Sequence, residues 1–126
     1  MKIRLTGQSL RLRLTQSEVS RLGLGKPVTE AIAFPGDARL ECVLQPSPSA
    51  SLISVTFRES LMRVLVSDRQ LYEWAASDHV GIEACVRVDQ LTSINVLIEK
   101  DFQCLDNRPE DTDAFPNPKA RRGVVA

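Results

Sequence analysis

Residues 10–19 have the sequence LRLRLTQSEV, in which a strand pattern changes abruptly to a helix start. Leucine and arginine alternate from Leu10 to Leu14, so the leucines share one face of an extended strand and the arginines share the other. Thr15-Gln16-Ser17-Glu18 then matches a capping box, in which hydroxyl and carboxylate satisfy free backbone donors at a helix start. The segment predicts a half-buried strand leading directly into a short helix.

The flanking sequence extends this pattern to a strand–strand–helix–strand–strand unit. Residues 2–5 alternate in the same way and are expected to form a hairpin with residues 10–14, joined through Gly7. The helix buries Val19 and Leu22 and ends at Gly23. Two further strands are expected, separated by a turn at 35–37, and they span residues 28–34 and 39–44.

The second part of the chain has the same order of elements. Residues 45–51 contain two prolines and three serines and are interpreted as a linker. A second capping box, Ser67-Asp68-Arg69-Gln70, opens a helix with Leu71 and Trp74 on one face. Strands are expected on both sides of this helix, at residues 52–57, 61–66, 80–88 and 93–100.

This order suggests an internal duplication. A shift of roughly 52 positions places Leu12 on Val64 and Thr15 on Ser67, while later pairs such as Glu30 with Glu83 need one or two extra residues. The alternative is that any strand–helix protein aligns with itself to some degree. The prediction is an α+β fold with two short helices, a mainly antiparallel β sandwich or partly open barrel built from two pseudo-twofold ββαββ halves, 1–45 and 52–100. Each half would cover the apolar sheet face of the other, and the groove between the halves is the natural place for a ligand.

Length and composition predict a single globular domain over residues 1–118, with a C-terminal segment 101–118 and a flexible tail 119–126. The formal net charge of +0 makes nucleic-acid binding unlikely. No apolar run is long enough for a membrane span, and the charged start does not match a secretion signal, so a soluble cytoplasmic protein is expected. The three cysteines, Cys42, Cys85 and Cys104, form no Cys-x-x-Cys pair and are expected to be reduced.

Four segments together resemble a family of short uncharacterised bacterial proteins: residues 10–19, residues 80–83 (VGIE), residues 99–105 (EKDFQCL) and residues 115–118 (FPNP). The resemblance covers nearly the whole chain. It implies one domain in a bacterial, cytoplasmic setting, and it implies no activity.

The C-terminal segment supplies the first candidate site, with Asp101, Cys104, Arg108, Glu110 and Asp111 as candidate binding residues. Cys104 is the candidate nucleophile, but activation of a thiol needs a neighbouring base or cation, and none is identifiable. His79, the only histidine, follows a predicted helix, where it is typical of a capping residue. The acidic cluster lacks the spacing of an EF-hand loop, so neither a metal nor a cofactor is expected.

Arginines supply the second candidate site. Arg4, Arg11, Arg13 and Arg63 are expected to form a basic stripe, because alternate strand residues share a face and the repeat makes Arg11 and Arg63 equivalent. An anion could bind there, although a solvated outer face is the favoured interpretation.

The leading functional interpretation is a small noncatalytic domain that binds a partner protein or a small molecule through the groove or the C-terminal segment. One alternative is a small enzyme that uses Cys104 or the acidic residues. The other is an anion- or nucleic-acid-binding module that uses the arginines. A homodimer formed through a free sheet edge is a further option. The common catalytic motifs are missing from the sequence.

Overall fold

The computed structural model describes residues 1–49 and 51–102. These residues form eight strands and two short helices, which confirms the predicted α+β class. The elements follow the chain as β1 (Lys2–Thr6), β2 (Ser9–Leu14), α1 (Gln16–Gly23), β3 (Val28–Phe34), β4 (Ala38–Ser47), β5 (Ser54–Arg58), β6 (Leu61–Ser67), α2 (Asp68–Ala75), β7 (Gly81–Arg87) and β8 (Ser93–Lys100).

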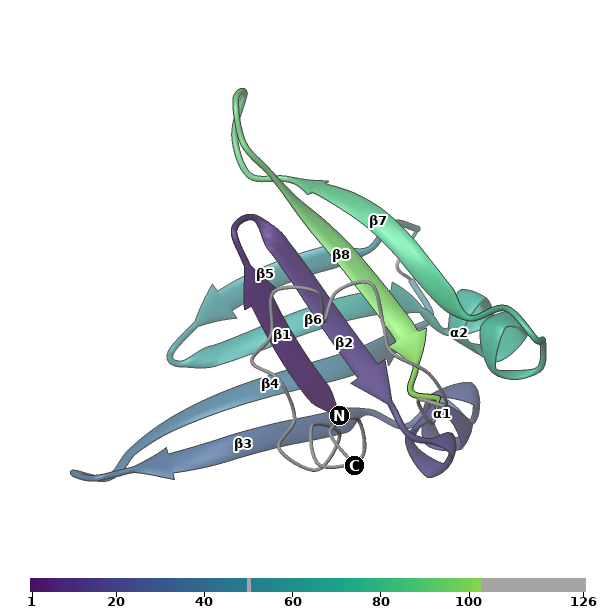
Figure 1. Cartoon of the computed structure of the whole chain (residues 1–126), viewed down its shortest axis with the longest axis horizontal. Helices are drawn as coiled ribbons and strands as arrows, with labels where there is room; N and C mark the ends of the chain where they lie inside the picture. The colour runs from purple at the N-terminus through teal and green to yellow at the C-terminus, as the bar shows by residue number, and fades with distance from the viewer. Residues whose placement is uncertain (50, 103–126) are drawn as a thin grey trace, which may run out of the picture.

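The strands form two four-stranded sheets that do not close into a barrel. The first sheet has the order β1-β2-β8-β7 and the second sheet has the order β3-β4-β6-β5. Figure 1 shows the strands of the first sheet running diagonally across those of the second, with both helices at one side. The outer pairings of each sheet are antiparallel, as predicted, but the central pairings, β2 with β8 and β4 with β6, are parallel. Both sheets are therefore mixed.

The halves interleave, which differs from the expectation that each half forms its own sheet face. Each half gives its first hairpin to one sheet and its second hairpin to the other, because a helix carries the chain across between them. The parallel central pairs then join the halves, with Leu12 opposite Ile98 in the first sheet and Leu44 opposite Val64 in the second.

The two sheets correspond to each other when the halves are exchanged. The exchange turns the order β1-β2-β8-β7 into β5-β6-β4-β3, which is the strand order of the second sheet read from its β5 edge. The central pair Leu12–Ile98 becomes Val64–Leu44, so the offset is 52 positions for the first hairpin and 54 for the second. With this register, Glu30 corresponds to Ala84 rather than to Glu83.

The core lies between the sheets and is closed at one side by the helices. Fully buried side chains come from the inner faces of the central strands, and Val19 and Leu22 of α1 meet Leu71 and Trp74 of α2. The first capping box forms as predicted, with Thr15 N–H donating to Glu18 Oε1 at 2.9 Å. At the second helix, Ser67 Oγ accepts from the N–H of Gln70 at 3.3 Å, which supplies one of the two contacts of the predicted box.

Two element boundaries differ from the prediction by more than one residue. β4 continues through Pro46 to Ser47, so it enters the predicted linker 45–51, because these residues still pair with β6. Pro46 lacks an N–H, and it is tolerated there because β3 pairs only as far as Leu44 and leaves that edge of β4 open. β5 begins at Ser54 rather than at Leu52.

Candidate functional site

A groove opens where the first sheet ends and the second sheet continues beneath it. Beyond β1, no other strand or helix of the described residues covers the far ends of β3, β4, β5 and β6 (Figure 1). The groove has a volume of about 670 Å³. Its apolar lining comes from all five of these strands and includes Ile3, Leu5, Ile32, Leu40, Phe57 and Met62.

The groove exposes large apolar side chains that belong to the inner faces of the sheets. Ile32 lies on the same face of β3 as the buried Val28, since strand side chains alternate. It is nevertheless 55% exposed, and Leu40 beside it is 44% exposed. Phe57 and Leu5 are 63% and 70% exposed. Several such side chains gathered in one hollow are typical of a binding surface rather than of ordinary surface scatter.

The equivalent positions at the opposite side of the molecule are better covered. By the register offsets, Ile3 corresponds to Val55, Ile32 to Val86 and Leu40 to Ile94. The three residues of the second set are half-buried and pack against the core. The groove beside β1 is therefore a difference between the two halves, and the fold does not require it.

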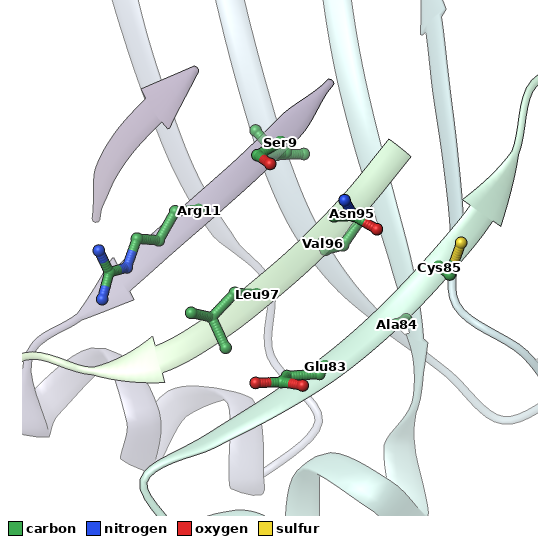
Figure 2. A pocket seen from close by; sticks show the side chains of 9 residues that line it. Ser9, Arg11, Glu83, Ala84, Cys85, Asn95, Val96 and Leu97 are labelled. Carbon is green, nitrogen blue, oxygen red and sulfur yellow. The ribbon is translucent and has the colours of Figure 1, made fainter. Parts of the chain in front are cut away.

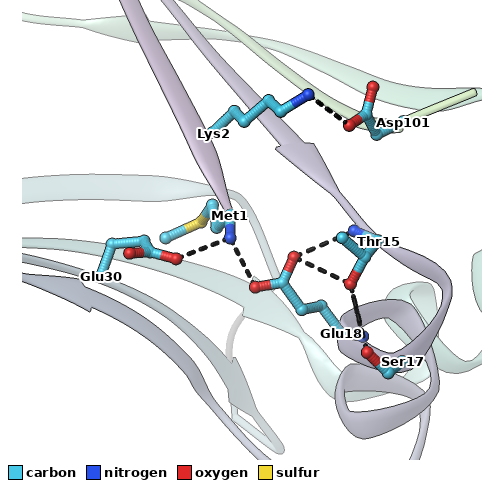
Figure 3. Close-up of polar contacts among 7 residues, drawn as sticks. All are labelled: Met1, Lys2, Thr15, Ser17, Glu18, Glu30 and Asp101. Carbon is cyan, nitrogen blue, oxygen red and sulfur yellow. Dashed lines mark hydrogen bonds and ion pairs between the residues drawn. The ribbon is translucent and has the colours of Figure 1, made fainter.

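Carboxylates lie at one margin of the groove. The α-amino group of Met1 lies 2.7 Å from Glu30 Oε1 and 2.5 Å from Glu18 Oε2, as Figure 3 shows. Burial acts to lower the pKa of this amino group, but the hydrogen bonds and charges of Glu18 and Glu30 outweigh it, so the pKa lies above its usual value of 8.0. Burial acts to raise the pKa of Glu18, and the hydrogen bonds from the amino group and Thr15 outweigh it and hold the pKa below 4.5.

The thiol in the groove, Cys42, is not activated. Cys42 lies at the floor of the groove, where burial, with a smaller contribution from the charge of Glu30, raises its pKa to about 11. It therefore stays protonated at neutral pH and is a poor nucleophile. Cys85 is exposed on the outer face of the first sheet. Both thiols are free, as predicted.

The predicted arginine stripe is wrong in one member. Arg4, Arg11 and Arg13 share the outer face of the first sheet, but Arg63 lies on the outer face of the second sheet. Arg11 on β2 and Arg63 on β6 occupy matching positions in the two sheets, and because the two sheets face each other, their outer faces lie on opposite sides of the molecule.

A buried carboxylate neutralises part of the remaining basic face. Glu99 is only 8% exposed, and its Oε1 accepts a hydrogen bond from Arg13 Nε at 2.6 Å. Arg11 Nε lies 2.7 Å from the same oxygen without the alignment of a hydrogen bond. Figure 2 shows the adjoining hollow over β2, β8 and β7, where Leu97 stands between Arg11 and Glu83. This face is a mixed-charge surface rather than a continuous cationic one.

The other predicted site residues are only partly described. Asp101 pairs with Lys2 at 2.9 Å, and its N–H donates to the carbonyl of Leu14 at 2.9 Å, so it attaches the end of β8 to the first sheet. Cys104, Arg108, Glu110 and Asp111 lie outside the described residues, as do almost all of the segment 101–118 and the tail 119–126. Ser77, rather than His79, contacts a terminal carbonyl of α2, with its Oγ donating to Trp74 O at 3.0 Å.

The described residues contain neither a metal-binding cluster nor a membrane-spanning helix. Over residues 1–49 and 51–102, no group of three or more His, Cys, Asp or Glu side chains is placed to hold a metal ion. Neither helix in this part of the chain has the length and apolar character needed to cross a membrane.

The comparisons with known proteins agree with the resemblance seen in the sequence. No curated protein and no solved structure matches the chain. A family model described as a family of unknown function, DUF7009, matches residues 1–119. Because this match covers almost the whole chain, the protein belongs to the DUF7009 family.

Proposed function

We propose that this protein is a noncatalytic binding domain, and that an apolar part of its partner occupies the groove beside β1. The observation that carries the proposal is the group of exposed apolar side chains on inner sheet faces, among them Leu5, Ile32, Leu40 and Phe57. The counterparts of Ile32 and Leu40, which are Val86 and Ile94, are half-buried against the core at the opposite side of the molecule. Covering these four side chains would contribute on the order of 5 kcal/mol, which is enough to offset much of the cost of association.

The two alternative functions have less support among the described residues. The enzyme alternative depends on Cys104 and the acidic cluster around it, which lie almost entirely outside the described residues, and Cys42 in the groove is held protonated by burial. The anion-binding alternative depends on four arginines, of which Arg63 is on the wrong face and Arg11 and Arg13 are paired with Glu99.

The test uses the neutral apolar dye Nile red, whose fluorescence rises when it leaves water. The wild-type chain is expected to bind the dye saturably, and Ile32→Glu to weaken binding by about tenfold, because the substitution puts a charge into the groove. Leu91→Glu is the matched control, since Leu91 is 97% exposed on the β7–β8 connection, away from the groove. Equal dye binding by wild type and a folded Ile32→Glu variant would refute the proposal.

We also propose that the chain arose by internal duplication and acts in the bacterial cytoplasm. The matching strand order and register of the two sheets support the duplication. The resemblance of residues 10–19 and 99–105 to short bacterial proteins supports the setting.

A further inference from the structure

We infer that the partner is an extended peptide segment that pairs with the free edge of β1 as a fifth strand of the first sheet. This inference rests on the proposed function, because the same segment would fill the groove. It adds the backbone conformation of the partner, the edge used and the side-chain pattern that the partner must have.

The first observation is the position of β1 at the edge of its sheet. β1 pairs with β2 on one side, and no strand of the described chain pairs with its other side. An edge strand directs alternate N–H and C=O groups away from its sheet, and these groups are a template for another strand. Recognition by strand addition uses such an edge together with pockets for alternate side chains.

The second observation is the apolar surface next to that edge. A strand added to β1 would lie about 4.8 Å from it, over the uncovered ends of the second sheet. Every second side chain of the added strand would point toward Ile32, Leu40 and Phe57, so these positions must be apolar. The added strand would give this part of the second sheet the cover that the half-buried Val86 and Ile94 have at the other side of the molecule.

The third observation is charge. The remaining side chains of the added strand would point outward, beside Arg4 and beside Lys2, which already pairs with Asp101, so Arg4 is the main cation on this face of β1. Opposite charges on neighbouring strands attract, so acidic side chains are favoured there. A second copy of this chain is disfavoured, since β1 pairing with itself would bring Lys2 and Arg4 against the same two cations. The partner therefore alternates apolar and acidic residues.

The experiment measures binding of a fluorescein-labelled peptide, Thr-Val-Glu-Ile-Glu-Val-Thr with blocked ends, to the full chain by fluorescence anisotropy. Two further peptides carry N-methyl groups on the odd or on the even residues. Alternate N–H groups of a strand point to opposite edges, and only one edge pairs with β1. One methylated peptide should therefore bind with the affinity of the parent, and the other should bind about tenfold or more weakly.

Charge is tested by an exchange of partners. Arg4→Glu should weaken binding of the parent peptide by about fivefold, and a peptide with lysine in place of glutamate should recover it. Arg63→Glu is the control, because Arg63 is exposed on the outer face of the other sheet and should leave binding unchanged.

The outcomes separate this inference from the proposed function. If both methylated peptides bind like the parent while Ile32→Glu removes binding, the groove binds ligands but strand pairing is wrong. If the peptide does not bind although Nile red does, strand addition is again wrong and the groove proposal stands. If light scattering shows a dimer that the peptide cannot separate, a second copy occupies the edge and the inference is overturned. If Ile32→Glu weakens the binding of neither Nile red nor the peptide, the proposed function itself fails.

Discussion

The α-amino group of Met1 is the residue-scale feature with the clearest physical consequence. Its two partners come from different elements, Glu18 from α1 and Glu30 from β3, so the contacts link β1 to both. The amino group has a raised pKa, so its contribution to stability is complete below pH 8.0 and is lost as pH rises through the pKa of the folded state. Glu18 has a lowered pKa, so its contribution is present above pH 4.5 and is lost as pH falls.

The first prediction is that Glu18→Gln lowers the free energy of unfolding by about 1 kcal/mol near pH 6.5, since the pair is only partly buried. Glutamine can keep the capping contact, so the loss reports the charge. Urea unfolding at a series of pH values measures the free energy of unfolding of variant and wild type. The difference between the two should shrink below pH 4.5 and above pH 8.0. Glu73→Gln, at an exposed pair with Arg69, is the control and should have little effect. A loss of stability that does not depend on pH would contradict its assignment to the ion pair between Glu18 and the Met1 amino group.

At the scale of elements, the close approach of α1 and α2 depends on one small residue. A Cβ added to Gly23 would lie 2.9 Å from the Cβ of Ala75, which is closer than two carbon atoms can pack. Gly23 and Ala75 are 52 positions apart, so they are equivalent residues of the two halves meeting each other.

The second prediction follows from this contact. Gly23→Ala should destabilise the protein by about 1–3 kcal/mol, because the helices must separate. The double variant Gly23→Ala with Ala75→Gly exchanges the two residues and should recover most of the loss. Thermal unfolding followed by circular dichroism measures both. A single variant as stable as wild type, or a double variant less stable than the single one, would contradict the helix contact.

The elements themselves could be predicted from the sequence because their signals are local. Alternation from Leu10 to Leu14 and the box that begins at Thr15 each involve residues within a few positions, and both are found as expected. The error at Pro46 has a non-local cause: proline and serine composition indicates a linker, but pairing with β6 keeps the chain extended.

At the scale of the whole molecule, the sequence could not identify strand partners. The alternation of apolar and polar residues predicts which face of a strand is apolar. It does not predict that Leu12 pairs with Ile98, far along the chain. The misplacement of Arg63 follows from this gap. The sequence predicted a groove between the halves but not its lining, because Ile32 and Leu40 have the same pattern as core residues and are exposed only by the offset between the sheets.

The third prediction concerns a circular permutant. Lys2 and Asp101 form an ion pair at 2.9 Å, so the two ends of the described chain are close. The permutant begins with residues 51–102, continues through a Gly-Ser linker of about four residues, and ends with residues 1–49. It should keep both sheets. It should be less stable than wild type, since the Met1 ammonium becomes a peptide N–H. Loss of the β-sheet circular dichroism spectrum would contradict the interleaved topology.

The most direct measurement is a methyl NMR spectrum of the isoleucine, leucine and valine side chains, recorded with and without the Thr-Val-Glu-Ile-Glu-Val-Thr peptide. The methyl signals of Ile3, Ile32 and Leu40 should shift as the groove fills. Those of their counterparts Val86 and Ile94 should stay in place. Shifts confined to the counterparts, or to Val88 and Leu91 at the far hairpin, would show that the groove beside β1 is not where this protein binds.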